Sequence, residues 1–273
     1  MPAGRRGQRL PPPASSGSYY DACREVCERI WSKIPELPFS QLYVAAQLFD
    51  KLPANSTVHL GILSPLRSWG YFPMAPSIEI YCNQGGFGID GNLSTLLGAS
   101  LAQPDKLFFG MVGDLSFFYD MNVLGNRHVG KNIRILLINN NVGAEFLLFR
   151  QIINSTSIDD IESYIAAKGH FGQKSPWLVK HYAEDLGYEY LSAANKEEFE
   201  TAYARFLVPE ITDKPMIFEI FTDSQDENDA LYRMWHIETS TTGLIREQAK
   251  KIIRDDDLVN RLKNNPLLNK LMK

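Results

Sequence analysis

Two short apolar runs, each ending in polar turn residues, constrain the fold of this chain more than any other feature. Residues 107–112 lead into Gly113-Asp114, and residues 133–138 lead into Asn139-Asn140-Asn141. Runs this short, nearly uncharged and bounded by turn residues are typical of parallel strands that are buried on both faces. Ligands bind where the carboxyl ends of neighbouring parallel strands meet. We therefore expect Asp114 and the asparagines to lie close together at one edge of a sheet.

The residue types at this edge suit a hard cation and a phosphate group. Mg²⁺ accepts carboxylate and carboxamide oxygens and completes its octahedron with phosphate and water. A helix-like segment follows Asp114, so the backbone amides of Leu115 and Ser116, with the Ser116 hydroxyl, would lie at a helix N-terminus that attracts anions. The residues alone predict a Mg²⁺-diphosphate site. Simple helix capping by Asp114 and simple turn formation by the asparagines are the alternatives.

Strands and helices alternate along the middle of the chain. Strands are expected at residues 58–62, 79–82, 107–112, 133–138, 188–191 and 215–221, and helices at 19–34, 40–52, 93–102, after 114, near 145, within 175–187 and at 196–206. This alternation predicts an α/β fold with a doubly wound, mainly parallel six-stranded sheet and helices on both faces.

Composition shifts divide the chain into four segments. Residues 1–17 are rich in Pro, Gly, Arg and Ser, and we expect a disordered lead-in or a cloning remnant. Residues 18–37 are expected to form a helical linker, and residues 38–228 contain all the predicted strands. Residues 229–273 carry Leu, Ile and basic residues at helical spacing, which predicts a helical C-terminal extension.

Three segments of the chain resemble motifs of the thiamine diphosphate enzymes. Gly113-Asp114, a long spacer and Asn140 resemble the diphosphate-binding motif of the family, Gly-Asp-Gly followed by Asn-Asn. Within the family, one branch is similar at three places: Leu115 in the third motif position, and the segments 83–95 and 119–122. This branch, which these segments resemble, is that of 2-succinyl-5-enolpyruvyl-6-hydroxy-3-cyclohexene-1-carboxylate synthase. A more distant resemblance is to the acetolactate synthases. The resemblance covers roughly residues 38–225. It implies a thiamine diphosphate-binding domain at residues 38–228, with thiamine diphosphate and Mg²⁺ as cofactors.

The resemblance also assigns roles to individual residues. The Mg²⁺ ligands become Asp114, Asn140 and the backbone carbonyl of Val142. The asparagine triple leaves the register open by one residue, with Asn141 as the reserve choice. The implied cofactor-binding residues are Gly113, Asp114, Leu115, Ser116, Asn140, Ile89, Ser64, Arg67 and Phe146.

Four of these residues have competing interpretations. Ile89 matches the bulky apolar residue that bends the cofactor in the family. The alternative is that Ile89 is an ordinary core isoleucine. Ser64 and Arg67 resemble a Ser/Arg pair near the cofactor diphosphate and the substrate, although their spacing is one residue shorter; Arg67 could instead be a surface arginine. Phe146 would line the thiazolium side, whereas an aromatic residue at this place is commonly core.

The function implied by the resemblance is that of a 2-oxo acid decarboxylase or acyl-transfer synthase component. Gln84 stands where the synthase has an arginine that would pair a substrate carboxylate, which favours a different acceptor. An acetolactate-synthase-like reaction is the second possibility. A non-catalytic thiamine diphosphate-binding or regulatory subunit is the alternative from another class.

The family's activating glutamate lies on a separate pyrimidine-binding domain, and residues 1–57 show no such domain. We therefore expect no catalytic residue in this chain, and an isolated chain that binds the cofactor weakly and turns nothing over. It would be a fragment or one subunit of a split enzyme, completed by a pyrimidine-binding domain or subunit in a homo- or hetero-oligomer.

Charge and cysteine content limit the remaining function classes. A net charge of −4 gives no reason to expect nucleic acid or an anionic membrane as a partner. No apolar run approaches the ~20 residues that span a bilayer, and the basic start lacks an apolar signal core. Cys23, Cys27 and Cys82 form a low, odd set, which favours a reducing cytoplasm. Cys23 and Cys27 share a helix face, where packing is favoured over a metal or redox pair.

Overall fold

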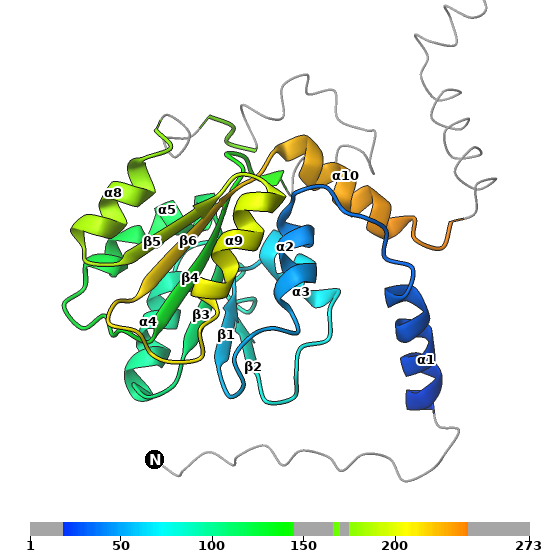
Figure 1. The fold of residues 1–273 in the computed structure, drawn as a ribbon, viewed down its shortest axis with the longest axis horizontal. Coiled ribbons are helices and arrows are strands. Elements are labelled where there is room, and N and C mark those ends of the chain that lie inside the picture. The colour runs from blue at the N-terminus through cyan, green and yellow to red at the C-terminus, as the bar shows by residue number, and fades with distance from the viewer. Residues whose placement is uncertain (1–18, 145–165, 170–174, 240–273) are drawn as a thin grey trace, which may run out of the picture. The chain divides into compact units, whose positions relative to one another are not determined.

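The chain divides into two compact units in a computed structural model that describes residues 19–144, 166–169 and 175–239. Residues 1–36 and 233–273 form one unit, whose described part includes helix α1 (Tyr19–Trp31). Residues 37–232 form the other unit and contain the whole sheet (Figure 1). The segments predicted as a disordered lead-in (1–17) and as a helix near residue 145 lie outside the described residues.

The sheet has six strands, and every neighbouring pair is parallel. Their order is β2-β1-β3-β4-β6-β5. The strands are β1 (Thr57–Leu60), β2 (Glu79–Cys82), β3 (Phe108–Gly113), β4 (Ile133–Asn139), β5 (Glu189–Ala193) and β6 (Met216–Phe221). All of β4 and all but the last residue of β3 are buried, because these central strands are covered on both faces. The predicted doubly wound parallel sheet is confirmed.

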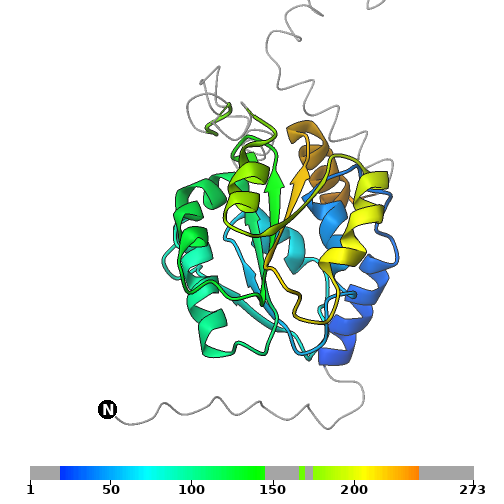
Figure 2. The same cartoon turned by 60° about the vertical axis from the view of Figure 1, so that its left-hand side comes forward.

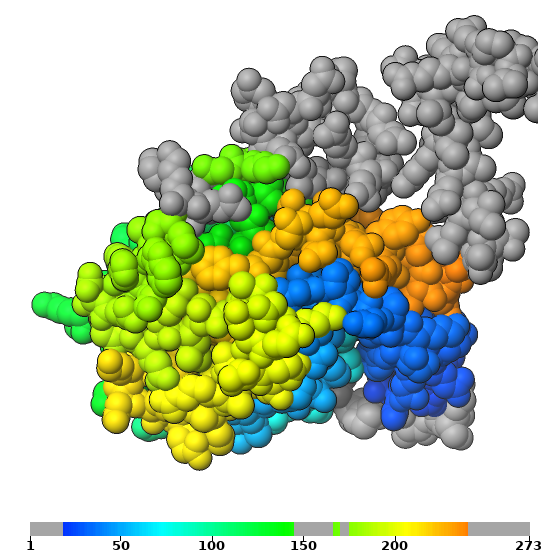
Figure 3. All heavy atoms as spheres, turned by 45° about the horizontal axis from the view of Figure 1, so that its top comes forward, coloured from blue at the N-terminus to red at the C-terminus, as the bar shows by residue number. Residues whose placement is uncertain are grey.

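Helices cover both faces of this sheet (Figure 2). Helix α4 (Asn92–Ala102), α5 (Asp114–Asp120), the 3₁₀ turn η1 (Met121–Gly125) and α8 (Leu178–Asp185) pack on one face. Helices α2 (Gln41–Leu48), α3 (Ser64–Gly70) and α9 (Lys196–Phe206) cover the other, and α10 (Ser224–Trp235) follows β6. The surface of α9 is continuous with that of β5 and α8 in Figure 3.

Each face has its own core. Alternate residues of β3 and β4 point to the α4 side, where Gly110 lets α4 approach closely: a Cβ at this position would lie 2.7 Å from Cδ2 of Leu96. The opposite face is aromatic, with Phe218 of β6 stacked on Phe199 of α9 at a ring-centroid distance of 5.9 Å. Helices therefore pack closely against both faces of the sheet.

Two local features differ from the sequence expectation. Helix α3 was not predicted, because its seven residues are too few to show a periodic pattern; Pro65 lies in its first turn. Leu63, just before it, has φ 66°, a left-handed conformation that is uncommon for a residue other than glycine. The helix expected to run to residue 52 ends at Leu48, although Ser40 caps it as predicted.

No helix within the described ranges is long and apolar enough to cross a membrane.

Candidate functional site

The strand order of the sheet reverses between β1 and β3. After β1 the chain adds β2 on one side and then returns to place β3 on the other. The connections that leave β1 and β3 go to opposite faces, α3 on one and α5 on the other, and such a reversal opens a crevice at the carboxyl edge. A cavity of about 670 Å³ lies at this place.

Most residues predicted for the site line this one cavity. They are Ser64, Ile89, Gly113, Asp114, Leu115, Ser116, Asn140 and Val142. Arg67 lines a neighbouring cavity instead. Phe146 lies outside the described residues.

Asp114 connects the two loops that the sequence predicted to meet. Its carboxylate is buried, with 3% of the residue exposed. Oδ2 accepts a hydrogen bond from the backbone N–H of Asn141 at 2.5 Å, and Oδ1 accepts one from Leu115 N–H at 2.7 Å. The start of α5 and the loop after β4 are therefore held together through one carboxylate.

The three asparagines at the end of β4 and directly after it have different surroundings. Asn139 is buried and donates from Nδ2 to Glu219 Oε1 at 2.7 Å, on the α8 side of the sheet. Asn140 lines the cavity, and its Oδ1 accepts a 3.3 Å bond from Val142 N–H. Asn141 is left-handed at φ 63°, and its buried Oδ1 has no hydrogen-bond partner among the described residues.

The loop that carries Ile89 is tied to α5 by a closed set of hydrogen bonds. The Ile89 carbonyl accepts from Ser116 Oγ at 2.6 Å and from Asn92 Nδ2 at 2.9 Å. Asn92 Nδ2 also lies 2.8 Å from Ser116 Oγ. The Ser116 hydroxyl was predicted to donate to a diphosphate, but in this arrangement its hydrogen is directed to Ile89.

A second set of hydrogen bonds joins the segments 83–95 and 119–122. The carboxylate of Asp120, at the end of α5, accepts from Ser94 N–H at 2.7 Å and from Ser94 Oγ at 2.6 Å. Asp120 thus satisfies an amide in the first turn of α4. Asp120 lies in one of the two segments that resemble the family's motifs, but no role for it was predicted from the sequence.

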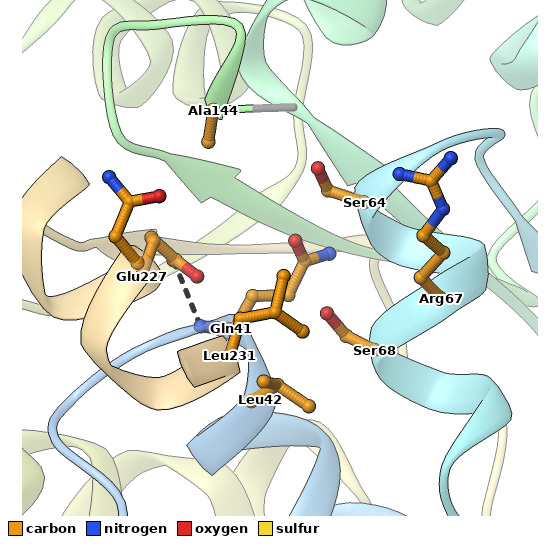
Figure 4. A pocket seen from close by; sticks show the side chains of 9 residues that line it. Gln41, Leu42, Ser64, Arg67, Ser68, Ala144, Glu227 and Leu231 are labelled. Carbon is orange, nitrogen blue, oxygen red and sulfur yellow. Dashed lines mark hydrogen bonds between the residues drawn. The ribbon is translucent and has the colours of Figure 1, made fainter. Parts of the chain in front are cut away.

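The neighbouring cavity, of about 360 Å³, is lined from α2, α3 and α10 (Figure 4). It shares Gln41, Ser64 and Ala144 with the first. In Figure 4, Ser64 and Arg67 come from α3, Gln41 comes from α2 and Glu227 comes from α10. A second chamber, lined by both polar and apolar side chains, therefore adjoins the cavity that holds Asp114.

Glu227 is the main acidic group of this chamber. It accepts hydrogen bonds from Gln41 N–H at 2.9 Å and from the Thr222 hydroxyl at 2.6 Å. Burial raises the pKa of its carboxyl to about 7, and the charge of Asp114 adds to the rise. Neither Gln41 nor Glu227 was predicted, because they belong to no motif and lie far apart in the chain.

Curated proteins match about three quarters of this chain. No family model matches the chain. It is 37% identical over 206 residues to the 2-succinyl-5-enolpyruvyl-6-hydroxy-3-cyclohexene-1-carboxylate synthase of Phocaeicola vulgatus, covering 74% of this chain and 35% of that protein. Identity to the enzyme of the same name from Bacteroides fragilis is 34% over 202 residues, with the same coverage. The chain thus spans about a third of the length of these curated relatives.

A solved structure shares the fold. It is the thiamine diphosphate-dependent 4-hydroxybenzoylformate decarboxylase of Rhodococcus jostii RHA1, with a TM-score of 0.53 and 21% identity. The match covers 69% of this chain and 33% of that one.

Proposed function

This chain belongs to the thiamine diphosphate-dependent enzyme family, and from that premise we propose that it forms the cofactor- and Mg²⁺-binding part of a 2-oxo acid decarboxylase or acyl-transfer synthase. One observation carries the proposal: Asn141 N–H donates to Asp114 Oδ2 at 2.5 Å beside a cavity that both loops enclose. The sequence likeness to synthases supports acyl transfer from a 2-oxo acid to an acceptor.

The donor atoms at this place fit Mg²⁺. Asp114 supplies one carboxylate, Asn140 a carboxamide oxygen and Val142 a backbone carbonyl, and all three residues line the cavity. Among the described residues no cluster of three or more His, Cys, Asp or Glu side chains could hold a metal. A site with one carboxylate suits Mg²⁺, because this ion keeps waters and takes further oxygens from a phosphate ligand.

The remaining lining residues would hold and orient the coenzyme. Gly113, Leu115 and Ser116 lie next to Asp114 and would face the diphosphate, while Ile89 would support the thiazolium ring. Arg67, in the adjoining chamber, would attract an anionic substrate group. Bound thiamine diphosphate supplies the carbanion-stabilising chemistry.

A pyrimidine-binding domain would complete the active site by supplying the activating glutamate. It would come from a partner chain in a homo- or hetero-oligomer, or from elsewhere in a longer protein. All three cysteines are free thiols, which supports a reducing cytoplasmic location.

Titration calorimetry of the full chain with thiamine diphosphate tests the proposal. We expect weak binding in Mg²⁺ that is lost when EDTA replaces the metal, since the diphosphate is held mainly through the ion. Addition of a pyrimidine-binding partner should then give decarboxylation of a 2-oxo acid. Binding without turnover alongside such a partner would favour the non-catalytic binding subunit. No binding in Mg²⁺ would overturn both functions.

Paired substitutions resolve which asparagine ligates the metal. Asn140→Ala removes the carboxamide that lines the cavity. We expect the Mg²⁺-dependent affinity for thiamine diphosphate to fall by about tenfold or more, as is typical when a group around a bound metal is removed. Asn141→Gly removes the other carboxamide while tolerating φ 63°, and should change the affinity by less than about threefold. Calorimetry of both variants checks this, and the opposite ranking would transfer the ligand role to Asn141.

A further inference from the structure

We propose that Asn92 is a positioning residue: its carboxamide holds the Ile89 carbonyl and the Ser116 hydroxyl in one hydrogen-bonded triangle, and so sets the position of Ile89 in the cofactor cavity. This inference rests on the proposed function, because it concerns how the same cavity would hold the ring portion of thiamine diphosphate.

The triangle is closed on all three sides. Asn92 Nδ2 donates to Ile89 O at 2.9 Å and approaches Ser116 Oγ at 2.8 Å, and Ser116 Oγ donates to Ile89 O at 2.6 Å. Asn92 is 1% exposed, so solvent does not compete for its amide. Movement of the Ile89 backbone would break two hydrogen bonds at once.

The three corners come from three different segments of the chain. Ile89 lies in the loop after β2, Asn92 is the first residue of α4, and Ser116 lies in the first turn of α5. Gly91, at φ 73°, makes the turn that brings Asn92 back towards Ile89. Both Ile89 and Ser116 line the cavity, whereas Asn92 does not, which is why it acts through its neighbours.

His59 is a buried neighbour of Asn92. This histidine lies in β1, is 4% exposed and interacts with the Asn92 side chain, while burial lowers the pKa of its imidazole. Nε2 of His59 and Oδ1 of Asn92 are both buried and have no hydrogen-bond partner among the described residues. The orientation of the Asn92 carboxamide is therefore set by the hydrogen bonds of Nδ2 to Ile89 and Ser116.

A comparison of two ligands separates positioning from general stability. Thiamine diphosphate would contact both the metal end and the Ile89 end of the cavity, whereas Mg²⁺-pyrophosphate would contact only the metal end. In Asn92→Leu, which is similar in size but lacks the amide, we expect thiamine diphosphate affinity to fall by about tenfold. Pyrophosphate affinity should change by less than about threefold.

Asn132 provides a matched control. It is likewise buried, and its Nδ2 donates to the backbone carbonyls of Ser100, Gln103 and Lys106 at 3.0–3.3 Å, before β4 and outside the cavity lining. Asn132→Leu should lower thermal stability and leave the ratio of the two affinities unchanged. Asn92→Asp is close to asparagine in size but loses the donor to Ile89, and should reproduce the selective loss if the leucine variant does not fold.

The outcomes are distinguishable from failure of the proposed function. If the unaltered chain does not bind thiamine diphosphate, the function itself fails. If it binds and the Asn92 variants keep its ratio of affinities, or lose both ligands equally as a merely structural residue would, the positioning role is overturned.

Discussion

Replacing Asp114 with asparagine is expected to lower the Mg²⁺-dependent affinity for thiamine diphosphate by at least about a hundredfold, or ~2.7 kcal/mol. Asp114 is the one carboxylate among the described residues that line the cavity. Without its charge, the remaining neutral oxygens compete poorly with water for a strongly hydrated ion. Titration calorimetry in Mg²⁺ measures the loss directly.

The Asp114→Asn variant retains an oxygen that can accept from Asn141 N–H, so the loop after β4 keeps its anchor. Asp105→Asn makes the same chemical change at an exposed position outside the cavity and should bind normally. Thermal unfolding without ligand shows whether each variant is folded. A folded Asp114→Asn protein that binds as tightly as its Asp105→Asn counterpart would contradict the metal assignment.

Replacing Glu227 with glutamine is expected to stabilise the fold at alkaline pH. Burial raises the pKa of the folded-state carboxyl from 4.5 to about 7, so between these values the folded chain holds a proton that the unfolded chain releases. Stability from this group is therefore complete below pH 4.5 and decreases as pH rises through 7. Above pH 7 the ionised carboxylate costs on the order of 3 kcal/mol.

Urea unfolding at pH 5 and pH 8 tests this expectation. Glutamine keeps an oxygen for Gln41 N–H and the Thr222 hydroxyl but carries no charge. The variant should match the unaltered chain at pH 5 and exceed its free energy of unfolding at pH 8. Glu197→Gln, at an exposed position in α9, should leave the pH dependence as it is. Equal pH dependence for the Glu227 variant and the unaltered chain would refute a protonated carboxyl in the chamber.

Local patterns in the sequence were sufficient to predict the strands of the sheet. The apolar run at 133–138 became the fully buried strand β4, and the run at 107–112 became most of β3. Both faces of these strands are covered, so each residue must be apolar or internally paired, and that requirement is visible without tertiary information. Helix α9 and strand β2 likewise begin and end at the predicted residues. Helix α3 was missed, because its seven residues are too few to show a periodic pattern.

The cavity could be predicted only in part from the sequence. Gly-Asp after one strand and asparagines after the next predicted the shared edge, since parallel neighbours must end on the same side. Which asparagine lines the cavity depended on side-chain direction at Asn139, Asn140 and Asn141, which strand order alone does not define.

The sequence by itself therefore determined the fold class and which residue types meet at the carboxyl edge, because both follow from residue type and short-range spacing. Only the tertiary structure brought Glu227 to Gln41, across 186 residues of chain, and locked Asn92 against Ser116. Such contacts depend on how α2, α4, α5 and α10 dock on the sheet. Docking is decided by packing of side chains that are distant in sequence, so no local pattern records it.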